Sequence, residues 1–328
     1  MKIGILGSGT WGTAIANMLA NNNHEVVLYG KKIEEIEFLK KTHTHPNLKG
    51  CVLSQNIVLT NDIKEGCFNQ EVIVFAMPSV FVRENAIEAK PFLPKDAIIV
   101  TVAKGIEADT LLTMSEVISD VIGEEYPIVA LSGPTHAEEV AIGQPTLIVS
   151  CCKDIKVAEK IQEAFSNNVL RVYTNTDIHA VELCGALKNI IALAAGMSDG
   201  MGFGDNAKAA IITRGLTEIT RLGMSIGGNQ STFFGLTGIG DIVVTATSTH
   251  SRNHNAGFLL GQGKSLDETL KEVGMVVEGV NALVAAKQLA NKYHIEMPIV
   301  DAVYSVIYEG VAPKEAVVKL FNRKQISE

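Results

Sequence analysis

Two residues, Lys188 and Asp241, have the side chains and surroundings that proton transfer requires. Lys188 lies in an apolar segment with helical spacing, where the small residues Gly185, Ala192 and Ala195 share its face. A lysine projecting over such a strip is partly desolvated, which lowers its pKa and suits it to donating and accepting a proton. A lysine at a helix start, with its ammonium reaching water, fits the same spacing equally well.

Asp241 follows the glycine-rich stretch Gly235–Gly240 and precedes the apolar run Ile242–Val244. A carboxylate in such a tight setting can orient and stabilise a nearby ammonium group. An Asp before an apolar run is also typical of a helix N-cap. The two roles are compatible, so both remain open from the sequence.

The segment Thr245–Asn253 has the composition of an anion-binding loop. It combines hydroxyl groups with Arg252, and no acidic residue occurs between its start and Gln262, in a chain of formal charge −8. Ser251 is expected to cap a helix containing Ala256–Leu260, whose N-terminus would attract a phosphate. The arginine can bind a phosphate through two parallel hydrogen bonds. An ordinary polar loop is the alternative.

A second glycine-rich stretch, Gly7–Gly12, fits the pattern G-x-G-x-x-G between a strand-like run and a helical run. In this pattern Gly7 permits a tight turn, Gly9 lets the backbone approach a pyrophosphate, and Gly12 lets the helix pack on the strand. A plain glycine-rich turn is the alternative. The position at residue 7, with a second strand at the expected distance, favours dinucleotide binding.

The end of the second expected strand bears on the choice of cofactor. An NAD-selective site usually has an acidic residue there, but the sequence reads Tyr29, Gly30, Lys31 and Lys32, with no carboxylate until Glu34. A small residue and two cations suit a 2′-phosphate, so we expect NADP(H) to be accepted, and a preference for NADP(H) stays open. Two solvated lysines at a helix start are the alternative.

Two later strand ends also carry polar groups. Lys104 follows the run Ala97–Val102, and Ser132–Ala137, with Gly133 and Thr135, follows the next one. Ligands of open α/β sheets bind at the carboxyl ends of the strands, which favours a binding role for these residues. A solvent-facing loop lysine is the alternative for Lys104.

The secondary structure expected to position these groups changes along the chain, from alternating strands and helices to helices alone. Short runs rich in Val and Ile alternate with helical patterns up to about residue 174, as in a sheet buried on both faces. The expected strands are Lys2–Leu6, Glu25–Tyr29, Ile57–Leu59, Val72–Ala76, Ala97–Val102, Ile128–Leu131, Thr146–Ser150 and Leu170–Tyr173. Helical patterns dominate afterwards. We therefore predict an α/β fold: a doubly wound, Rossmann-type, mostly parallel sheet at residues 1–178 and an all-helical domain at residues 179–328.

Composition narrows the function classes further. A net charge of −8 argues against a nucleic-acid partner. We expect no membrane span and no signal peptide, and hence a cytoplasmic protein, whose five cysteines are buried thiols in a reducing compartment. We expect no metal site, because His43 and His45 have no third ligand nearby. Arg214 and Glu218 are expected to pair at helical spacing.

These segments together resemble bacterial-type NAD(P)-dependent glycerol-3-phosphate dehydrogenases over nearly the whole chain. The stretches that carry the resemblance are Gly7–Gly12, Val102–Gly105, Ser132–Val140, Gly185–Asn189, Asp199–Gly215, Thr232–Asp241, Thr247–Asn253, Val276–Val280 and Met297–Tyr308. The most specific are Gly-Ala-Leu-Lys-Asn, Gly-Ile-Gly-Asp and Ser-Arg-Asn in this order. Ala246 and Met275 depart from the usual Cys and Gln, and neither position is an expected catalytic one.

The resemblance implies a role for each matching residue. Lys188 and Asp241 would be catalytic. The implied cofactor-binding residues are Gly7, Gly9, Thr10, Trp11, Gly12, Lys31, Lys104, Ala137, Arg252, Val276 and Glu278. The implied substrate-binding residues are Lys104, Gly133, Thr135, Lys188, Asp241, Ser251, Arg252 and Asn253.

The reaction implied by the resemblance is reduction of dihydroxyacetone phosphate, a small phosphorylated triose, to sn-glycerol 3-phosphate with NADP(H) or NAD(H), supplying phospholipid synthesis. Another dehydrogenase with a helical second domain is one alternative, although such families usually place the catalytic Lys and Asn a helical turn apart, whereas Lys188 and Asn189 are adjacent. A non-catalytic NAD(P) sensor is the other. The apolar residues Val300, Val303, Tyr304 and Ile307 could form a homodimer contact or, as we favour, part of the domain core.

Overall fold

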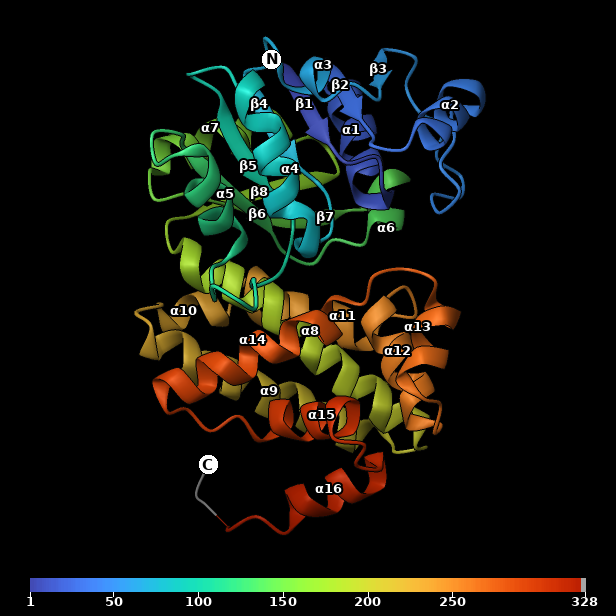
Figure 1. Ribbon diagram of the computed structural model, residues 1–328, viewed down its shortest axis with the longest axis vertical. Coiled ribbons are helices and arrows are strands. Elements are labelled where there is room, and N and C mark those ends of the chain that lie inside the picture. The colour runs from blue at the N-terminus through green and yellow to red at the C-terminus, as the bar shows by residue number, and fades with distance from the viewer. Residues whose placement is uncertain (326–328) are drawn as a thin grey trace. The chain divides into compact units, whose positions relative to one another are not determined.

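A computed structural model describes residues 1–325, and the chain divides into two compact units (Figure 1). The first unit comprises Met1–Lys104 and Leu112–Glu182, and the second comprises Gly105–Leu111 and the chain from Leu183 onward. The division falls inside one long helix. The domain boundary expected near residue 178 stays a prediction.

The first unit is built on one eight-stranded sheet with the order β3-β2-β1-β4-β5-β6-β7-β8. The strands are β1 (Lys2–Leu6), β2 (Glu25–Tyr29), β3 (Ile57–Thr60), β4 (Val72–Phe75), β5 (Ile98–Thr101), β6 (Ile128–Ser132), β7 (Thr146–Cys151) and β8 (Leu170–Asn175). All neighbours pair in parallel except β6 and β7. The expected mostly parallel, doubly wound sheet is confirmed, with strand ends that differ by at most two residues from the expected ones.

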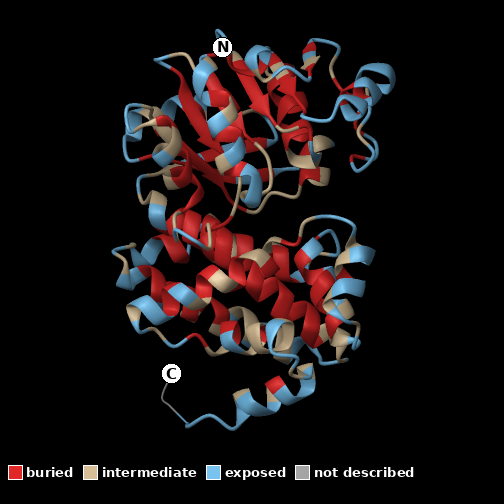
Figure 2. Ribbon diagram, viewed as in Figure 1, coloured by how far each residue is buried: buried red, intermediate tan, exposed pale blue. Residues whose placement is uncertain are grey.

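Helices bury both faces of this sheet. They are α1 (Thr10–Asn21), α2 (Ile33–Thr42), α3 (Ile63–Cys67), α4 (Val82–Ala89), α5 (Met114–Ile122), α6 (Ala137–Ala141) and α7 (Ile155–Phe165). One core joins β-strand residues such as Ile3 and Ile5 to α1 and α7, and the other joins Ile73 and Phe75 to α4 and α5. Val72 and Val74 belong to the first core and Ile73 and Phe75 to the second, so adjacent residues of β4 face opposite cores. Figure 2 shows the central strands of the sheet mostly buried.

The second unit is built from helices. They are the Leu183–Gly200 part of α8 (Ile178–Gly200), α9 (Asp205–Ser225), α10 (Gln230–Phe233), α11 (Asp241–Thr247), α12 (Arg252–Gly261), α13 (Leu266–Val273), α14 (Glu278–Tyr293), α15 (Pro298–Tyr308) and α16 (Pro313–Phe321). A single π-helical turn, Leu236–Gly240, leads into α11. The expected helical second half is confirmed.

Helix α8 is long, apolar and buried. Among the described residues it alone has the length and composition that a membrane span requires, but 94% of its apolar window is buried inside the protein. Such burial is typical of a core helix. Lys188 therefore lies in the interior of a buried helix and not at its start, which removes the alternative of a lysine whose ammonium reaches water from a helix end.

The expected pair between Arg214 and Glu218 is replaced by another contact. The buried Glu218 carboxylate accepts hydrogen bonds from the backbone N–H groups of Ile299 (2.8 Å) and Val300 (3.3 Å), in the first turn of α15. These amides have no partner within their own helix. Arg214 and Glu218 have the expected helical spacing. However, the N–H groups at the buried N-terminus of α15 need an acceptor, and this need determines where the Glu218 carboxylate points.

Candidate functional site

The glycine-rich turn lies at the point where the strand order of the first unit reverses, between β1 and β4. Gly7 has a φ of 122° and its N–H donates to the Tyr29 carbonyl at 2.9 Å. A Cβ on Gly7 would lie 2.5 Å from the Ala76 carbonyl oxygen, immediately after β4. Both the backbone conformation and the space therefore require glycine here. Ligands of doubly wound sheets bind at this switch point.

Gly9 and Gly12 differ in what surrounds them. A Cβ on Gly12 would lie 2.0 Å from the Gly7 carbonyl oxygen, so this glycine lets α1 pack against the turn. A Cβ on Gly9 would meet no atom within 4 Å. Gly9 also precedes α1 without a side-chain cap for the helix amides. The turn thus combines open space with helix N–H groups that no side chain caps, which fits an incoming pyrophosphate.

Two further cofactor candidates, Thr10 and Trp11, begin α1. The Thr10 hydroxyl accepts a hydrogen bond from the Asn47 amide at 3.3 Å, and the half-buried Trp11 packs on the sheet core. The loop residue Asn47 therefore lies against the start of α1, a contact that the sequence did not suggest.

The cations after β2 are paired with carboxylates. Lys31 Nζ lies 2.6 Å from Glu84 Oε1 and 2.8 Å from Glu88 Oε1, both on α4. Lys32 Nζ lies 3.0 Å from Glu35 Oε1, and the Ser8 hydroxyl lies 3.4 Å from the other oxygen of Glu35. The sequence suggested two uncompensated positive charges, whereas the structure surrounds them with three carboxylates.

Four other predicted residues gather after β5 and β6. Lys104 Nζ donates to the Gly133 carbonyl at 3.0 Å, and the Thr135 hydroxyl donates to the same oxygen at 3.2 Å. Gly133 has a φ of 148°, which favours glycine. Ala137 is the first residue of α6. The lysine therefore lies at the carboxyl edge of the sheet and bonds across two strand ends.

The predicted catalytic residues meet in the second unit. Lys188 Nζ donates to Asp241 Oδ1 at 2.7 Å and to the Thr245 hydroxyl at 2.6 Å. The Thr245 hydroxyl in turn donates to the Asp241 carbonyl at 2.6 Å. Lys188 is 7% and Asp241 1% exposed, so both charges are buried together. Asp241 is the first residue of α11 and Gly240 its N-cap, so the N-cap expectation for Asp241 is wrong.

A buried amide chain lies beside this pair. Asn253 donates from its side chain to the Asn189 side-chain oxygen at 3.0 Å, and its own oxygen accepts from the Gly279 N–H at 2.8 Å. Asn189 follows Lys188 in α8, and Gly279 lies in the first turn of α14. The chain therefore joins α8, α12 and the start of α14 through one side chain.

The predicted anion loop is organised around the start of α12. Ser251 caps this helix, as expected, because its hydroxyl accepts from the His254 N–H at 3.1 Å. Arg252 is exposed and donates to the Val276 carbonyl at 3.2 Å. Glu278, another predicted cofactor residue, is half-buried at the start of α14. The predicted residues of this loop thus lie near one another along α12 and the start of α14.

Glycines hold α12 against α8. A Cβ on Gly196 would lie 2.0 Å from the His254 carbonyl oxygen, and one on Gly257 would lie 2.1 Å from the Leu193 carbonyl oxygen. Gly200 and Gly261 make equivalent contacts one helical turn further on. These close approaches fix the start of α12 relative to Lys188.

A charged network supports the same region. The buried His254 ring lies 2.8 Å from Asp199 Oδ2, and Lys208 Nζ lies 2.8 Å from the same oxygen. Thr245 was predicted only as part of the anion-binding segment Thr245–Asn253 and not as a partner of Lys188, and neither Asn189 nor this network was among the predicted site residues. The repeat of Asp241 and Thr245 at four residues was the available signal, because such residues share one face of a helix.

The predicted residues thus form two groups, one in each unit. The first unit contains Gly7, Gly9, Thr10, Trp11, Gly12, Lys31, Lys104, Gly133, Thr135 and Ala137. The second contains Lys188, Asp241, Ser251, Arg252, Asn253, Val276 and Glu278.

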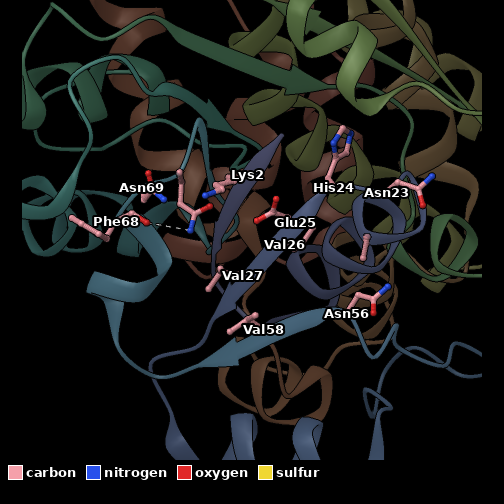
Figure 3. A pocket seen from close by; sticks show the side chains of 12 residues that line it. Lys2, Asn23, His24, Glu25, Val26, Val27, Asn56, Val58, Phe68 and Asn69 are labelled. Carbon is pink, nitrogen blue, oxygen red and sulfur yellow. Dashed lines mark hydrogen bonds between the residues drawn. The ribbon is translucent and has the colours of Figure 1, made fainter.

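A pocket of about 490 Å³ lies apart from the glycine-rich turn (Figure 3). Lys2 and Glu25, the first residues of β1 and β2, line it together with His24. This is the amino edge of the sheet, opposite to the carboxyl edge where the predicted cofactor residues lie. No group of three or more potential metal ligands occurs within residues 1–325.

The switch-point turn and the buried lysine–aspartate pair define a dinucleotide-dependent oxidoreductase. A sequence model of a protein family, described as the N-terminus of NAD-dependent glycerol-3-phosphate dehydrogenase, matches residues 2–158. The corresponding family model for the C-terminus matches residues 177–318. The chain belongs to the family of NAD(P)-dependent glycerol-3-phosphate dehydrogenases.

Individual relatives agree with this assignment over nearly their full lengths. The chain is similar to glycerol-3-phosphate dehydrogenase (NAD(P)+) 2 of Lactobacillus delbrueckii subsp. bulgaricus, with 53% identity over 100% of this chain and 98% of the relative. A relative in Bacillus velezensis is 49% identical over 100% of this chain and 96% of its own length. The crystal structure of glycerol-3-phosphate dehydrogenase from Coxiella burnetii has a TM-score of 0.94 and 34% identity, with 98% of both chains covered.

Proposed function

We propose that this enzyme reduces dihydroxyacetone phosphate to sn-glycerol 3-phosphate, with Lys188 as the proton donor. The observation that carries the proposal is the buried Lys188–Asp241 pair, because a buried, strongly interacting ionisable pair is a candidate for a functional site. The names of the similar proteins supply the substrate class, and the product belongs to phospholipid synthesis.

The residues of the first unit suit the dinucleotide. Gly7, Gly9 and Gly12 shape the turn, and the N–H groups at the start of α1, with Thr10 and Trp11, would hold the pyrophosphate. Further proposed cofactor-binding residues are Lys31, Lys104 and Ala137 of this unit and Arg252, Val276 and Glu278 of the second unit. A bound nicotinamide supplies the hydride for the substrate carbonyl carbon.

Lys188 donates the proton in one direction of the reaction and accepts it in the other. During reduction, negative charge grows on the carbonyl oxygen, and the Lys188 ammonium stabilises it and then donates the proton. In the reverse direction the neutral amine takes the proton from the hydroxyl group. Asp241 and Thr245 accept and donate hydrogen bonds that hold the amine in one orientation.

The phosphate of the triose needs cationic and hydrogen-bonding partners. We propose Arg252, Ser251 and Asn253 at the start of α12, together with Lys104, Gly133 and Thr135, for this role. Fixing the phosphate would orient the carbonyl group for hydride transfer. In a chain of net charge −8, these local donors have to overcome a repulsive overall field.

Loss of absorbance at 340 nm from NADH, and separately from NADPH, tests the proposed reaction. Oxidation that requires dihydroxyacetone phosphate, and does not occur with dihydroxyacetone, is the expected result. No oxidation with either cofactor, in protein that binds NADH, would contradict the proposed substrate and favour a non-catalytic sensor or another dehydrogenase.

Two broader expectations accompany this function. All five cysteines are free and buried, which supports a reducing compartment and hence the cytoplasm. On α15, Val300 and Val303 are buried whereas Tyr304 and Ile307 are half-buried, so the latter two are the residues available to a homodimer contact. Light scattering on the purified protein would determine its oligomeric state.

A further inference from the structure

The surroundings of Lys31 carry information about cofactor choice that the glycine-rich turn does not. Tyr29, at the end of β2, accepts the Gly7 N–H, and a Cβ on Gly30 would lie 2.2 Å from the Ser8 hydroxyl. The residues after β2 therefore lie directly against the turn. In doubly wound folds this is where the adenosine ribose and any 2′-phosphate are read.

Lys31 is the residue that a 2′-phosphate would use, and two carboxylates already hold it. Its ammonium lies 2.6 Å from Glu84 and 2.8 Å from Glu88. The hydrogen bonds that Lys31 donates to both carboxylates raise its pKa, and the contact with Lys31 lowers the pKa of Glu84. Both shifts favour the charged forms of Lys31 and Glu84.

The second lysine does not restore a positive field. Lys32 pairs with Glu35 at 3.0 Å, so three carboxylates surround two ammonium groups near the turn. A 2′-phosphate carries a charge of about −2 at neutral pH and is repelled by this arrangement. A 2′-hydroxyl is neutral and can donate a hydrogen bond to a carboxylate.

We propose that Glu84 and Glu88 of α4 determine the cofactor preference of this enzyme, by neutralising Lys31 and thereby favouring NADH over NADPH. The inference rests on the proposed cofactor site in the first unit. NADPH can still bind when Lys31 leaves its partners, because Lys31 and Glu84 are exposed, Glu88 is only half-buried, and surface ion pairs of this kind are weak. The two lysines after β2 thus allow NADPH to bind, and the two glutamates lower the affinity for NADPH.

The variants that test this inference change charge while keeping shape. Glu84→Gln and Glu88→Gln remove the carboxylates, and Lys31→Gln in the double variant removes the cation that they release. Glu159→Gln is the matched control, because Glu159 is an exposed residue of α7 in the same unit and changes the net charge equally. Exposed positions of this kind leave the fold intact, which thermal unfolding checks.

Binding is measured by calorimetry with 5′-AMP and 2′,5′-ADP, which differ only in the 2′-phosphate, and the kcat/KM ratio of NADPH to NADH is measured in parallel. We expect each Glu→Gln variant to raise the affinity of 2′,5′-ADP relative to 5′-AMP by roughly three- to tenfold at low salt. The NADPH to NADH ratio should rise in the same way, Lys31→Gln should abolish the gain, and Glu159→Gln should leave both ratios unchanged.

Three results would overturn the inference. Unchanged ratios in the Glu84→Gln/Glu88→Gln variant would show that the glutamates do not select the cofactor. An equal gain in Glu159→Gln would show that only net charge matters. Failure of 5′-AMP to bind any variant would remove the proposed cofactor site itself, whereas normal 5′-AMP binding with unchanged ratios would remove only this inference.

Discussion

Lys188 Nζ lies 2.7 Å from Asp241 Oδ1 although the two residues are 53 positions apart in the chain. One comes from the interior of α8 and the other from the first turn of α11, directly after a π-helical turn. A π-turn inside helical structure is frequently found at functional sites. The pair is thus the product of two elements that only tertiary packing brings together.

Asp241→Asn should leave the Lys188 charge buried without its counter-charge. Breaking a buried ion pair costs about 3–5 kcal/mol of unfolding free energy, and misplacement of the ammonium should lower kcat by roughly a hundredfold or more. The affinity for NADH should remain close to that of the unmodified protein. Denaturant titration and steady-state kinetics measure both effects, and an unchanged kcat would contradict the orienting role.

Thr245 is predicted to hold Lys188 through its hydroxyl group alone. Thr245→Val keeps the shape but removes the acceptor at 2.6 Å, so kcat should fall by about tenfold, with a stability loss of about 1–3 kcal/mol. Thr245→Ser retains the hydroxyl and should recover most of the activity. Equal loss in the two variants would indicate that the methyl group matters and the hydrogen bond does not.

Gly9 and Gly12 should respond differently to the same substitution. Gly9→Ala places a Cβ in open space, so the melting temperature should stay constant while NADH affinity falls by at least tenfold, since the methyl group fills the approach to the pyrophosphate. Gly12→Ala forces a clash at 2.0 Å with backbone and should lower the melting temperature. Unaltered NADH affinity in Gly9→Ala, measured by fluorescence titration, would place the cofactor elsewhere.

Glu218 should make stability depend on pH below neutrality. Desolvation by burial raises its pKa from 4.5 to about 7, against the backbone hydrogen bonds from Ile299 and Val300, which favour the charged form. The folded state then binds more protons than the unfolded state between these values, so the contribution of this group is fully present below pH 4.5 and is lost as pH rises through about 7.

The measurement compares thermal unfolding of the unmodified protein and of Glu218→Gln from pH 4.5 to 8. The stability of the unmodified protein relative to the variant should decline by up to about 1.4 kcal/mol per pH unit over this range. A constant or rising difference would show that the hydrogen bonds to α15 outweigh desolvation.

Local patterns were sufficient to predict most of the fold. Runs of Val and Ile predicted all eight strands, and the glycine spacing at residues 7–12 predicted the switch-point turn. Ser251 was predicted as a cap because capping depends on neighbours only three residues away. These features are determined by short stretches of chain, which is why the sequence was enough.

Contacts between distant segments were not predictable in the same way. Lys31 meets Glu84 and Glu88 more than 50 positions later, and Glu218 meets Ile299 and Val300 of another helix. For Lys31 the sequence showed no partner, and for Glu218 it suggested a different partner, Arg214, four positions away. The need of the buried α15 amides for an acceptor determined the partner of Glu218, whereas opposite charge brings Lys31 to the two carboxylates of α4.

The role of Lys188 is tested most directly by replacing it with alanine and measuring single-turnover oxidation of NADH by dihydroxyacetone phosphate, with and without added primary amines. We predict a rate lower by about 10²–10⁴-fold, with unchanged NADH affinity and partial recovery in the presence of a small amine that can occupy the vacated space. Near-normal hydride transfer in Lys188→Ala would contradict the account, because the proton would then come from another group.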